Sequence, residues 1–358
     1  MRSLKIWVLA PFQRQGSLLG TKKASVCKAF FAAASSPMKV DLIIQSGSTI
    51  FYPAVEEGIT LDLERKGSPG KLKFSVVKDD VISFQEGDAV KLAVDGTDIF
   101  YGFVFTKSRS GQSPYLIEVT AYDQLRYFKN KDTYVYSNKK ANEVIQMIAE
   151  DFGLQVGTLE DTGHIIASRT EDNATLFDIA QNALDETLQA KTQLYVLYDD
   201  VGKLTLKNIE NMKLDLLIDA DTIGNYSYSS TIDSQTYNQI KITFENQETG
   251  AREIFIAKDS ANINAWGLLQ YTDTVELSTS GAAKAEALLK LYNTKTRQLS
   301  ISDAIGDLRV RAGSSVIVKL GLRDINIQSY LLVESVSHKF NHEQHLMDLK
   351  LRGGTFVT

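Results

Sequence analysis

From Met38 to Tyr122, apolar and polar residues alternate with a period of two, which predicts a series of β-strands. Two of these runs are separated by Asp95-Gly96, a two-residue signal typical of a tight hairpin. About six strands joined by short loops predict a small antiparallel barrel or sandwich. The apolar runs on which this prediction rests are Val40–Ile44, Ile50–Tyr52, Leu61–Leu63, Leu72–Val76, Val90–Val94, Ile99–Phe105 and Tyr115–Tyr122.

The period then changes to 3.6 residues, which predicts helices. The first helix has Ser137 or Asn138 as its cap and Gly153 just past its end. A second helix is predicted at about Ala174–Leu188, followed by a hairpin of Gln193–Tyr198 and Leu204–Asn208. This region is predicted to be a compact α+β insertion. The buried face of the first helix is predicted to hold Ala141, Val144, Ile145, Ile148, Ala149 and Phe152.

The later part of the chain returns to strands and resembles the first β region. Gly87 matches Gly313 at an offset of 226 residues, and Tyr101 matches Tyr330 at an offset of 229. The agreement in order, spacing and alternation predicts an internal duplication, the alternative being two unrelated β regions with similar turns. The predicted elements are strands at Tyr237–Glu245 and Glu253–Ala257, a helix at Ala282–Leu291, and strands at Ser315–Leu320, Ser329–Lys339 and His345–Leu351.

These patterns predict a mainly β protein with an α+β insertion. Two similar small antiparallel barrels are expected, joined by a helix-containing domain. The predicted divisions are a doubtful N-terminal extension at 1–37, a first β-barrel module at 38–125, an α+β domain at 126–220 and a second β-barrel module at 221–358.

Residues 1–37 differ from the rest in charge, since they hold six basic residues and no acidic one. The whole chain has a net charge of −5, so the remainder carries −11, which disfavours nucleic-acid binding through phosphates. The segment is interpreted as sequence upstream of a true start at Met38, as a flexible arm, or as a targeting segment. No apolar run is long enough to predict a membrane span.

Candidate catalytic and metal-binding residues are few. His338, His342 and His345 are the nearest approach to a metal cluster, but His345 is expected to face away from the other two, and a turn at 341–343 to separate all three. His164 lies in a polar turn without a nucleophile motif nearby. The acidic pairs Glu56-Glu57, Asp79-Asp80 and Asp199-Asp200 are interpreted as solvated residues at strand ends and turns.

Two further features have ordinary structural explanations. Tyr134-Val135-Tyr136 is predicted to belong to the core rather than to a sugar-binding platform. Cys27 is the single cysteine, which excludes an intramolecular disulfide, and only Lys28 beside it would activate the thiol. No catalytic, cofactor-binding or metal-binding residue is therefore predicted, and the chain is not expected to be an enzyme.

Several segments resemble the hub proteins of PBSX-like prophages, within the late control gene D group of contractile-tail hubs. The central segment 121–134 leads into the first predicted helix, and 306–313 opens the closing part of the pattern. Ser314 stands where members of the group often carry Asp. The other matching segments are 183–187, 197–206, 237–238, 336–340 and 345–349.

The resemblance implies a structural baseplate hub that forms a homotrimer. Its two tube-like barrels per chain would make a pseudo-sixfold ring connecting the tail tube protein to a central spike. A tape-measure protein is a further candidate partner, and no specific nucleic-acid binding or membrane insertion is expected. The alternatives are the hub of a type VI secretion or bacteriocin machine, and a cell-wall-binding or degrading protein.

Overall fold

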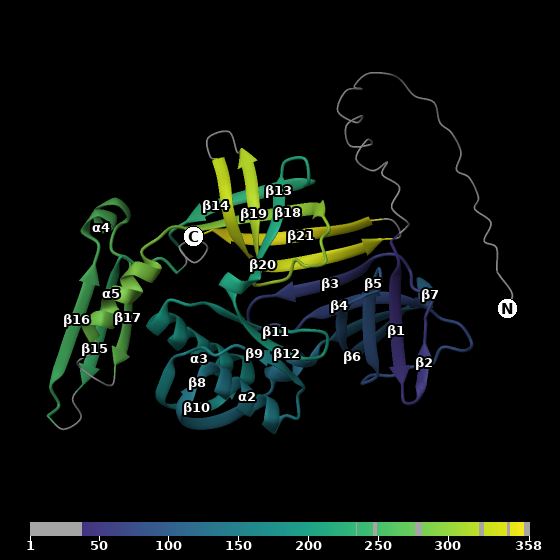
Figure 1. Ribbon diagram of the computed structural model, residues 1–358, viewed down its shortest axis with the longest axis horizontal. Helices are drawn as coiled ribbons and strands as arrows, with labels where there is room; N and C mark the ends of the chain where they lie inside the picture. Colours follow the sequence, from purple (N-terminus) through teal and green to yellow (C-terminus); the bar gives the residue numbers. More distant parts are fainter. Residues whose placement is uncertain are drawn as a thin grey trace, which may run out of the picture. The chain divides into compact units, whose positions relative to one another are not determined.

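The computed structural model describes residues 38–233, 235–245, 249–275, 281–321, 326–341 and 344–353 (Figure 1). Strands make up most of this part of the chain. The predicted mainly β class is therefore confirmed. The segment 1–37, which includes Cys27, lies outside the described residues, as does His342.

The first β region consists of strands whose alternate residues face a core. In β4, Leu72, Phe74 and Val76 are buried on one side of the strand. Asp95 and Gly96 join β5 to β6 with φ angles of 49° and 79°, as a type I′ turn requires, so the predicted hairpin is confirmed. The strands are β1 (Val40–Ser46), β2 (Thr49–Phe51), β3 (Ile59–Glu64), β4 (Lys71–Val77), β5 (Ala89–Val94), β6 (Thr97–Ser110) and β7 (Ser113–Tyr122).

The middle of the chain packs two helices against short strands around one apolar cluster. The predicted inner face of helix α2 is buried, with Phe152 packed at its margin. The elements are η1 (Gln124–Lys129), β8 (Lys131–Lys140), α2 (Ala141–Asp151), β9 (Val156–Leu159), β10 (Ile165–Thr175), α3 (Leu176–Lys191), β11 (Tyr195–Asp199), β12 (Leu204–Asn208) and η2 (Ile209–Met212).

The start of α2 differs from the prediction, which placed the cap at Ser137 or Asn138. Lys140 is the N-cap, and its backbone N–H donates to Glu143 Oε2 over 2.7 Å. The cap lies later because β8 remains paired with β10 as far as Lys140. Gly153, with φ of 63°, follows the helix as predicted.

The last third of the chain contains two groups of strands. Strands β15, β16 and β17 pack against α5 around Ile240, Ile242 and Leu288, and the others join the large sheet. The elements are β13 (Lys213–Asp219), β14 (Asn225–Thr231), β15 (Gln239–Glu245), β16 (Arg252–Lys258), α4 (Ser260–Trp266), β17 (Gln270–Val275), α5 (Gly281–Tyr292), β18 (Thr296–Ile305), β19 (Ser315–Gly321), β20 (Asn326–Asn341) and β21 (Gln344–Gly353).

Thirteen of the described strands form one sheet, in which β3 lies beside β20 (Figure 1). All its pairings are antiparallel except that of β13 with β19. The prediction of two separate barrels differs from this arrangement, because β3 extends the sheet into the second β region. Among the described strands, no pairing closes either region into a ring.

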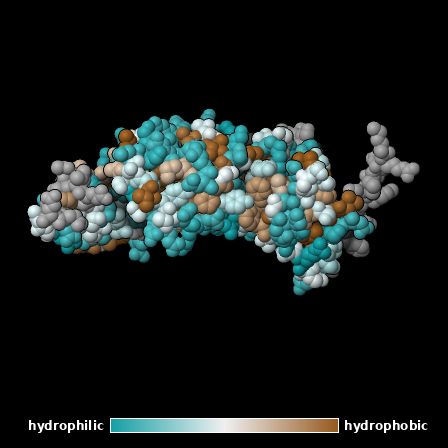
Figure 2. Space-filling view, turned by 90° about the horizontal axis from the view of Figure 1, so that it is seen from below, coloured by the Kyte–Doolittle hydropathy of each residue, from teal (hydrophilic) through white to brown (hydrophobic). Residues whose placement is uncertain are grey.

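The surface of the described chain mixes polar and apolar residues. Figure 2 shows hydrophobic side chains mostly as separate spots among hydrophilic ones on the face in view. None of the described helices is long and apolar enough to cross a bilayer.

Candidate assembly interface

The large sheet contains the same order of strands twice. The first set is β3-β4-β7-β6-β5-β1 and the second is β14-β18-β21-β20-β19-β13. Counterpart strands also follow one another in the same order along the chain. One pairing differs, because β1 is antiparallel to β5 whereas β13 is parallel to β19. The segment 232–295 between β14 and β18 replaces the short loop 65–70 between β3 and β4.

The two sets also share their registers. In the first hairpin, Val90 lies opposite Gly102 and Lys91 lies opposite Tyr101. The counterpart pairs in the second hairpin are Val316 opposite Leu331 and Ile317 opposite Tyr330. These are the predicted offsets of 226 and 229 residues. The next ladder bulges directly after Val104 in the first set and directly after Val333 in the second. The predicted duplication is therefore confirmed in strand order and register.

The matched glycines perform the same task in both sets. Gly87 and Gly313 have φ angles of 93° and 95°, which residues other than glycine rarely adopt. The Gly87 N–H donates to Val104 O over 2.8 Å, and the Gly313 N–H donates to Val333 O over 2.8 Å. Each glycine therefore fixes the turn that leads into the first strand of its hairpin.

The residue after each glycine closes this turn with its side chain. Asp88 Oδ2 accepts a hydrogen bond from Gln85 N over 2.7 Å, and Ser314 Oγ accepts one from Arg311 N over 3.2 Å. Ser314 thus keeps the acceptor that Asp supplies in the first set, and its departure from the family pattern preserves the turn.

The two sets meet where β3 pairs with β20. Six register pairs run from Ile59 opposite Phe340 to Glu64 opposite Ser335. Leu61 in β3 and Val336 in β20 are each 2% exposed. This junction joins the edge strand of the first set to the long strand of the second through a continuous antiparallel ladder.

An ion-pair network covers one end of this junction. Arg65 Nε lies 2.7 Å from Glu334 Oε2, and Arg352 Nε lies 2.8 Å from Glu334 Oε1. The Arg65 side chain is 5% exposed. Burial alone would raise the pKa of Glu334, but the two guanidinium groups hold this pKa below its usual value. The carboxylate is therefore ionised and tied to both sides of the junction.

Polar side chains also connect the two strands directly. Ser337 in β20 donates to Asp62 Oδ1 in β3 over 2.6 Å, and the two residues are register partners. Lys71 Nζ of β4 lies 3.0 Å from Asp62 Oδ2. The side chains of Ser337 and Asp62 therefore lie on the same face of the sheet and contact each other.

A second contact joins the middle region to the second set through Arg311. Its guanidinium stacks 3.7 Å from the Tyr198 ring and donates from Nη2 to Asp199 O over 2.8 Å. Asp123 lies in the same buried region, and burial, followed by the charge of Asp199, raises its pKa well above the usual range. Arg311 is therefore the cation that offsets two buried carboxyl groups.

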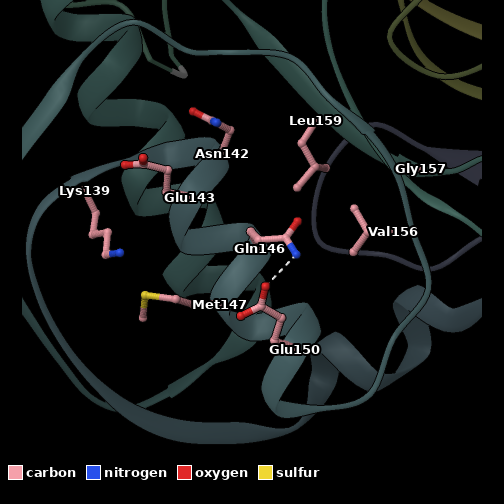
Figure 3. A pocket seen from close by; sticks show the side chains of 9 residues that line it. All are labelled: Lys139, Asn142, Glu143, Gln146, Met147, Glu150, Val156, Gly157 and Leu159. Carbon is pink, nitrogen blue, oxygen red and sulfur yellow. Dashed lines mark hydrogen bonds between the residues drawn. The ribbon is translucent and has the colours of Figure 1, made fainter.

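A shallow cavity of about 430 Å³ lies between α2 and β9 (Figure 3). Gln146 Nε2 donates to Glu150 Oε1 over 2.8 Å on the helix side, whereas Val156 and Leu159 line the strand side. None of the candidate residues weighed in the sequence analysis lines this cavity.

The histidine prediction is wrong for His345. Its Nε2 lies 2.8 Å from Nδ1 of His338. The hairpin between β20 and β21 folds the chain back, so that His345 lies opposite Phe340 and on the same face as His338. The turn thus brings two of the three histidines together instead of separating them. In the part of the chain that the structure describes, no group of three His, Cys, Asp or Glu residues could hold a metal ion.

The acidic pairs differ in their burial. Asp79 is exposed and accepts hydrogen bonds from Val81 N and Ile82 N, as expected of a turn residue. Asp199, by contrast, is 8% exposed and accepts from Gly202 N, so the prediction of a solvated carboxylate is wrong there. The difference arises because the β11–β12 turn packs against Arg311.

The remaining candidates have structural roles. Tyr134 and Tyr136 are 6% and 4% exposed, which confirms their place in the core, whereas Val135 between them is 71% exposed. His164 Nε2 lies 3.3 Å from Glu186 Oε1. Sequence reasoning missed the Arg65–Glu334 pair, which joins residues 269 positions apart and has no local signal.

Comparison with known proteins identifies the family of this chain. The sequence profile of the YQBQ-like family matches residues 59–352. The chain belongs to this family. The phage-like element PBSX protein XkdQ of Bacillus subtilis is 28% identical over 311 residues, which cover 84% of this chain and 93% of XkdQ. The resemblance to PBSX-like hub proteins is thereby confirmed.

Solved structures show that the fold is shared more widely. The 43 kDa tail protein of prophage MuSo2 from Shewanella oneidensis has a TM-score of 0.63 at 12% identity, covering 87% of this chain and 98% of its own. A type VI secretion component from E. coli, described as similar to the T4 tail proteins gp27 and gp5, has a TM-score of 0.54 at 10% identity. That match covers 88% of this chain and 78% of the E. coli protein.

Proposed function

We propose that this chain is the structural hub of a contractile-tail baseplate in a phage or phage-like particle. Three copies would form a pseudo-sixfold ring that connects the tail tube to the central spike. The observation that carries this proposal is the duplicated sheet, because three copies of a chain with two equivalent strand sets present six equivalent units around one axis. The names of two similar proteins, a protein of the phage-like element PBSX and a prophage tail protein, support a place in the tail of such a particle.

The proposed building blocks follow from the same repeat. Residues 38–125 and 221–358 would act as two tube-like modules, completed into barrels in the assembled ring, and the α+β domain at 126–220 would lie between them in sequence. The proposed partners are the tail tube protein and the central spike, with a tape-measure protein as a further partner. The role is structural rather than enzymatic, in a particle assembled in the bacterial cytoplasm.

The oligomeric state of the purified full chain tests this proposal. Mass photometry should show a species of three 39.7 kDa chains, and electron-microscopy class averages should show a ring with six similar densities. In cells that produce the particle, deletion of the gene should leave tubes that are not joined to a spike. A chain that stays monomeric, together with intact particles after deletion, would contradict the hub role.

A type VI secretion hub is a second candidate, favoured by the shared fold with the E. coli component. Affinity purification from the native cell separates the two possibilities. Copurification of a phage tail tube protein supports the baseplate hub, whereas copurification of a secretion tube protein supports the second candidate.

A further inference from the structure

We propose that β6 of one copy pairs antiparallel with β14 of the next copy, with Ser108 opposite Ser229. This contact would repeat between copies the β3–β20 junction that joins the two strand sets within each chain. The inference rests on the proposed hub function, because it requires neighbouring copies of the same chain.

The repeat determines which strands would meet. Strand β14 is the counterpart of β3, because β14 pairs with β18 in the way that β3 pairs with β4. In these two pairings Ser227 lies opposite Ser300, and Thr60 lies opposite Lys73. Strand β6 is the counterpart of β20, as their registers with β7 and β21 show. Within the chain, β3 pairs with β20. If their counterparts pair in the same way, β14 pairs with β6, and these two strands must come from different copies.

Both of these edges are unpaired in the single chain. Strand β14 pairs only with β18, and β6 beyond Thr106 pairs only with β7, as far as the described strands show. Ser108 and Ser229 are exposed, whereas their counterparts in the internal junction, Ser337 and Asp62, contact each other. The unpaired backbone groups of such edges are a template for a further strand.

The composition of β14 favours pairing rather than protection. Protected edges usually carry charged residues or proline, and Asn225–Thr231 contains neither. The facing part of β6 carries Lys107 and Arg109, and β14 has no cation that would repel them. Charge therefore does not oppose the contact.

The bulge residue of β6 differs in chemistry from the bulge residue of β20, and its expected partner in the second set differs in the same way. In the internal junction, the bulge residue Glu334 contacts Arg65 and Arg352. By the repeat, Phe105 takes the place of Glu334. Its ring centroid lies 5.5 Å from that of Tyr122, the counterpart of Arg352.

The position of Arg65 corresponds to Ile232 in the second set, by the register of β14 with β18. The contact between copies would therefore pair Ile232 with Phe105. An apolar contact between Ile232 and Phe105 would replace the charged contact between Arg65 and Glu334, so the residues on both strands change from charged to apolar.

The contact is head-to-tail, since each copy offers one β6 edge and one β14 edge. Such heterologous contacts close into a ring when the rotation between copies permits it. Three copies would then bury all six of these edges, so that no β6 or β14 edge would remain for further addition.

Disulfide cross-linking of the full chain tests the register. In a Cys27→Ser background, Ser108→Cys with Ser229→Cys should form bonds between copies and give a covalent trimer on a non-reducing gel. The matched control is Ser108→Cys with Ser230→Cys, because successive residues of a strand point to opposite faces. Asp62→Cys with Ser337→Cys should form the equivalent bond within one chain and serves as the positive control.

The outcomes separate this inference from the proposed function. A covalent trimer from the 108/229 pair, with at least tenfold less from the 108/230 pair, supports both. A non-covalent trimer that does not cross-link at 108/229, or cross-links equally at 108/230, overturns the strand pairing and leaves the hub role standing. Cross-linked dimers or open chains without a trimer support the pairing and contradict the ring, and a protein that never self-associates contradicts both.

Hydrogen exchange of the unmodified chain gives an independent readout that does not depend on cysteine variants. Amides in 106–110 and 225–231 should gain protection in the assembled species relative to the dilute monomer. Amides in β3 should be protected in both states, because β3 is already paired on both sides. Equal exchange of the 106–110 and 225–231 amides in the two states would overturn the pairing.

Discussion

His338 accepts a hydrogen bond at Nδ1 from Nε2 of His345 over 2.8 Å. The donor is assigned because Nε2 of His338 donates to the carbonyl oxygen of Val310 over 2.9 Å and must carry the proton. Burial, followed by the neighbouring His345, lowers the pKa of His338 to about 3, and burial lowers the pKa of His345 to about 4. Both rings are therefore neutral in the folded protein at pH 7.

We expect this pair to make the second strand set sensitive to acid. Below about pH 6.5 the unfolded chain binds two protons that the folded chain does not, so the free energy of unfolding falls as the pH falls towards 4. Each buried histidine contributes up to about 1.4 kcal/mol per pH unit, and less for His345, which solvent partly screens. Denaturant unfolding between pH 7 and pH 4.5 measures the slope.

His345→Gln separates the two contributions. The glutamine amide can still donate to His338, so the fold is retained, while one titrating group is lost. We expect a smaller pH slope than that of the unmodified protein. An unchanged slope would show that other groups cause the acid sensitivity.

Arg65→Met should destabilise the junction between the two strand sets. It leaves the half-buried Glu334 carboxylate with Arg352 as its remaining ion-pair partner, at a cost of about 2–3 kcal/mol in the free energy of unfolding. The control is Lys66→Met, which removes a neighbouring pair with Asp185 at 3.4 Å that is over 40% exposed and should cost less than about 1 kcal/mol. Equal losses in chemical denaturation would contradict a special role for Arg65.

Arg311→Gln should destabilise the protein more at pH 7 than at pH 5. Without the guanidinium, Asp123 and Asp199 have no buried cation, at a cost of about 3 kcal/mol while they are ionised. Burial has already raised the pKa of both groups, and protonation at lower pH relieves the loss. Arg309→Gln, which removes the pair between the exposed Arg309 guanidinium and Asp307, should change stability little at either pH. A loss that is independent of pH would contradict this assignment.

Replacement of Gly87 and of Gly313 by alanine should lower the free energy of unfolding by different amounts. Gly87→Ala should cost about 1–3 kcal/mol for its positive φ alone, since open space surrounds the added Cβ. Gly313→Ala should cost about 1–3 kcal/mol more, because the Cβ would lie 2.7 Å from Val196 Cγ1. Val196→Ala should recover this extra part in the double variant, as thermal unfolding would show. No coupling between the two positions would contradict the packing explanation.

Local patterns predicted the elements whose residues carry a clear period. The face of α2 and the Asp95-Gly96 hairpin depend on neighbours within a few positions, and both are confirmed. The repeat was found because Gly87 and Gly313 each begin a hairpin of the same spacing.

Features that depend on long-range pairing could not be predicted in this way. Strand β14 alternates tyrosine and serine without aliphatic residues, so its sequence lacks the usual strand signal. The sequence predicted a turn at 341–343, but the contact of His338 with His345 depends on the register of β20 with β21, which local patterns do not determine. The Arg65–Glu334 pair likewise requires the junction between strands far apart in sequence.

The segment 232–295 occurs in only one of the two strand sets. In the proposed ring, every second position would therefore carry an additional lobe of β15–β17, α4 and α5, and the positions between would carry only the short loop 65–70. A partner with sixfold symmetry could bind the parts that all positions share. A partner with threefold symmetry could instead bind the alternating lobes, so a single insertion after β14 would allow one ring to present two different symmetries.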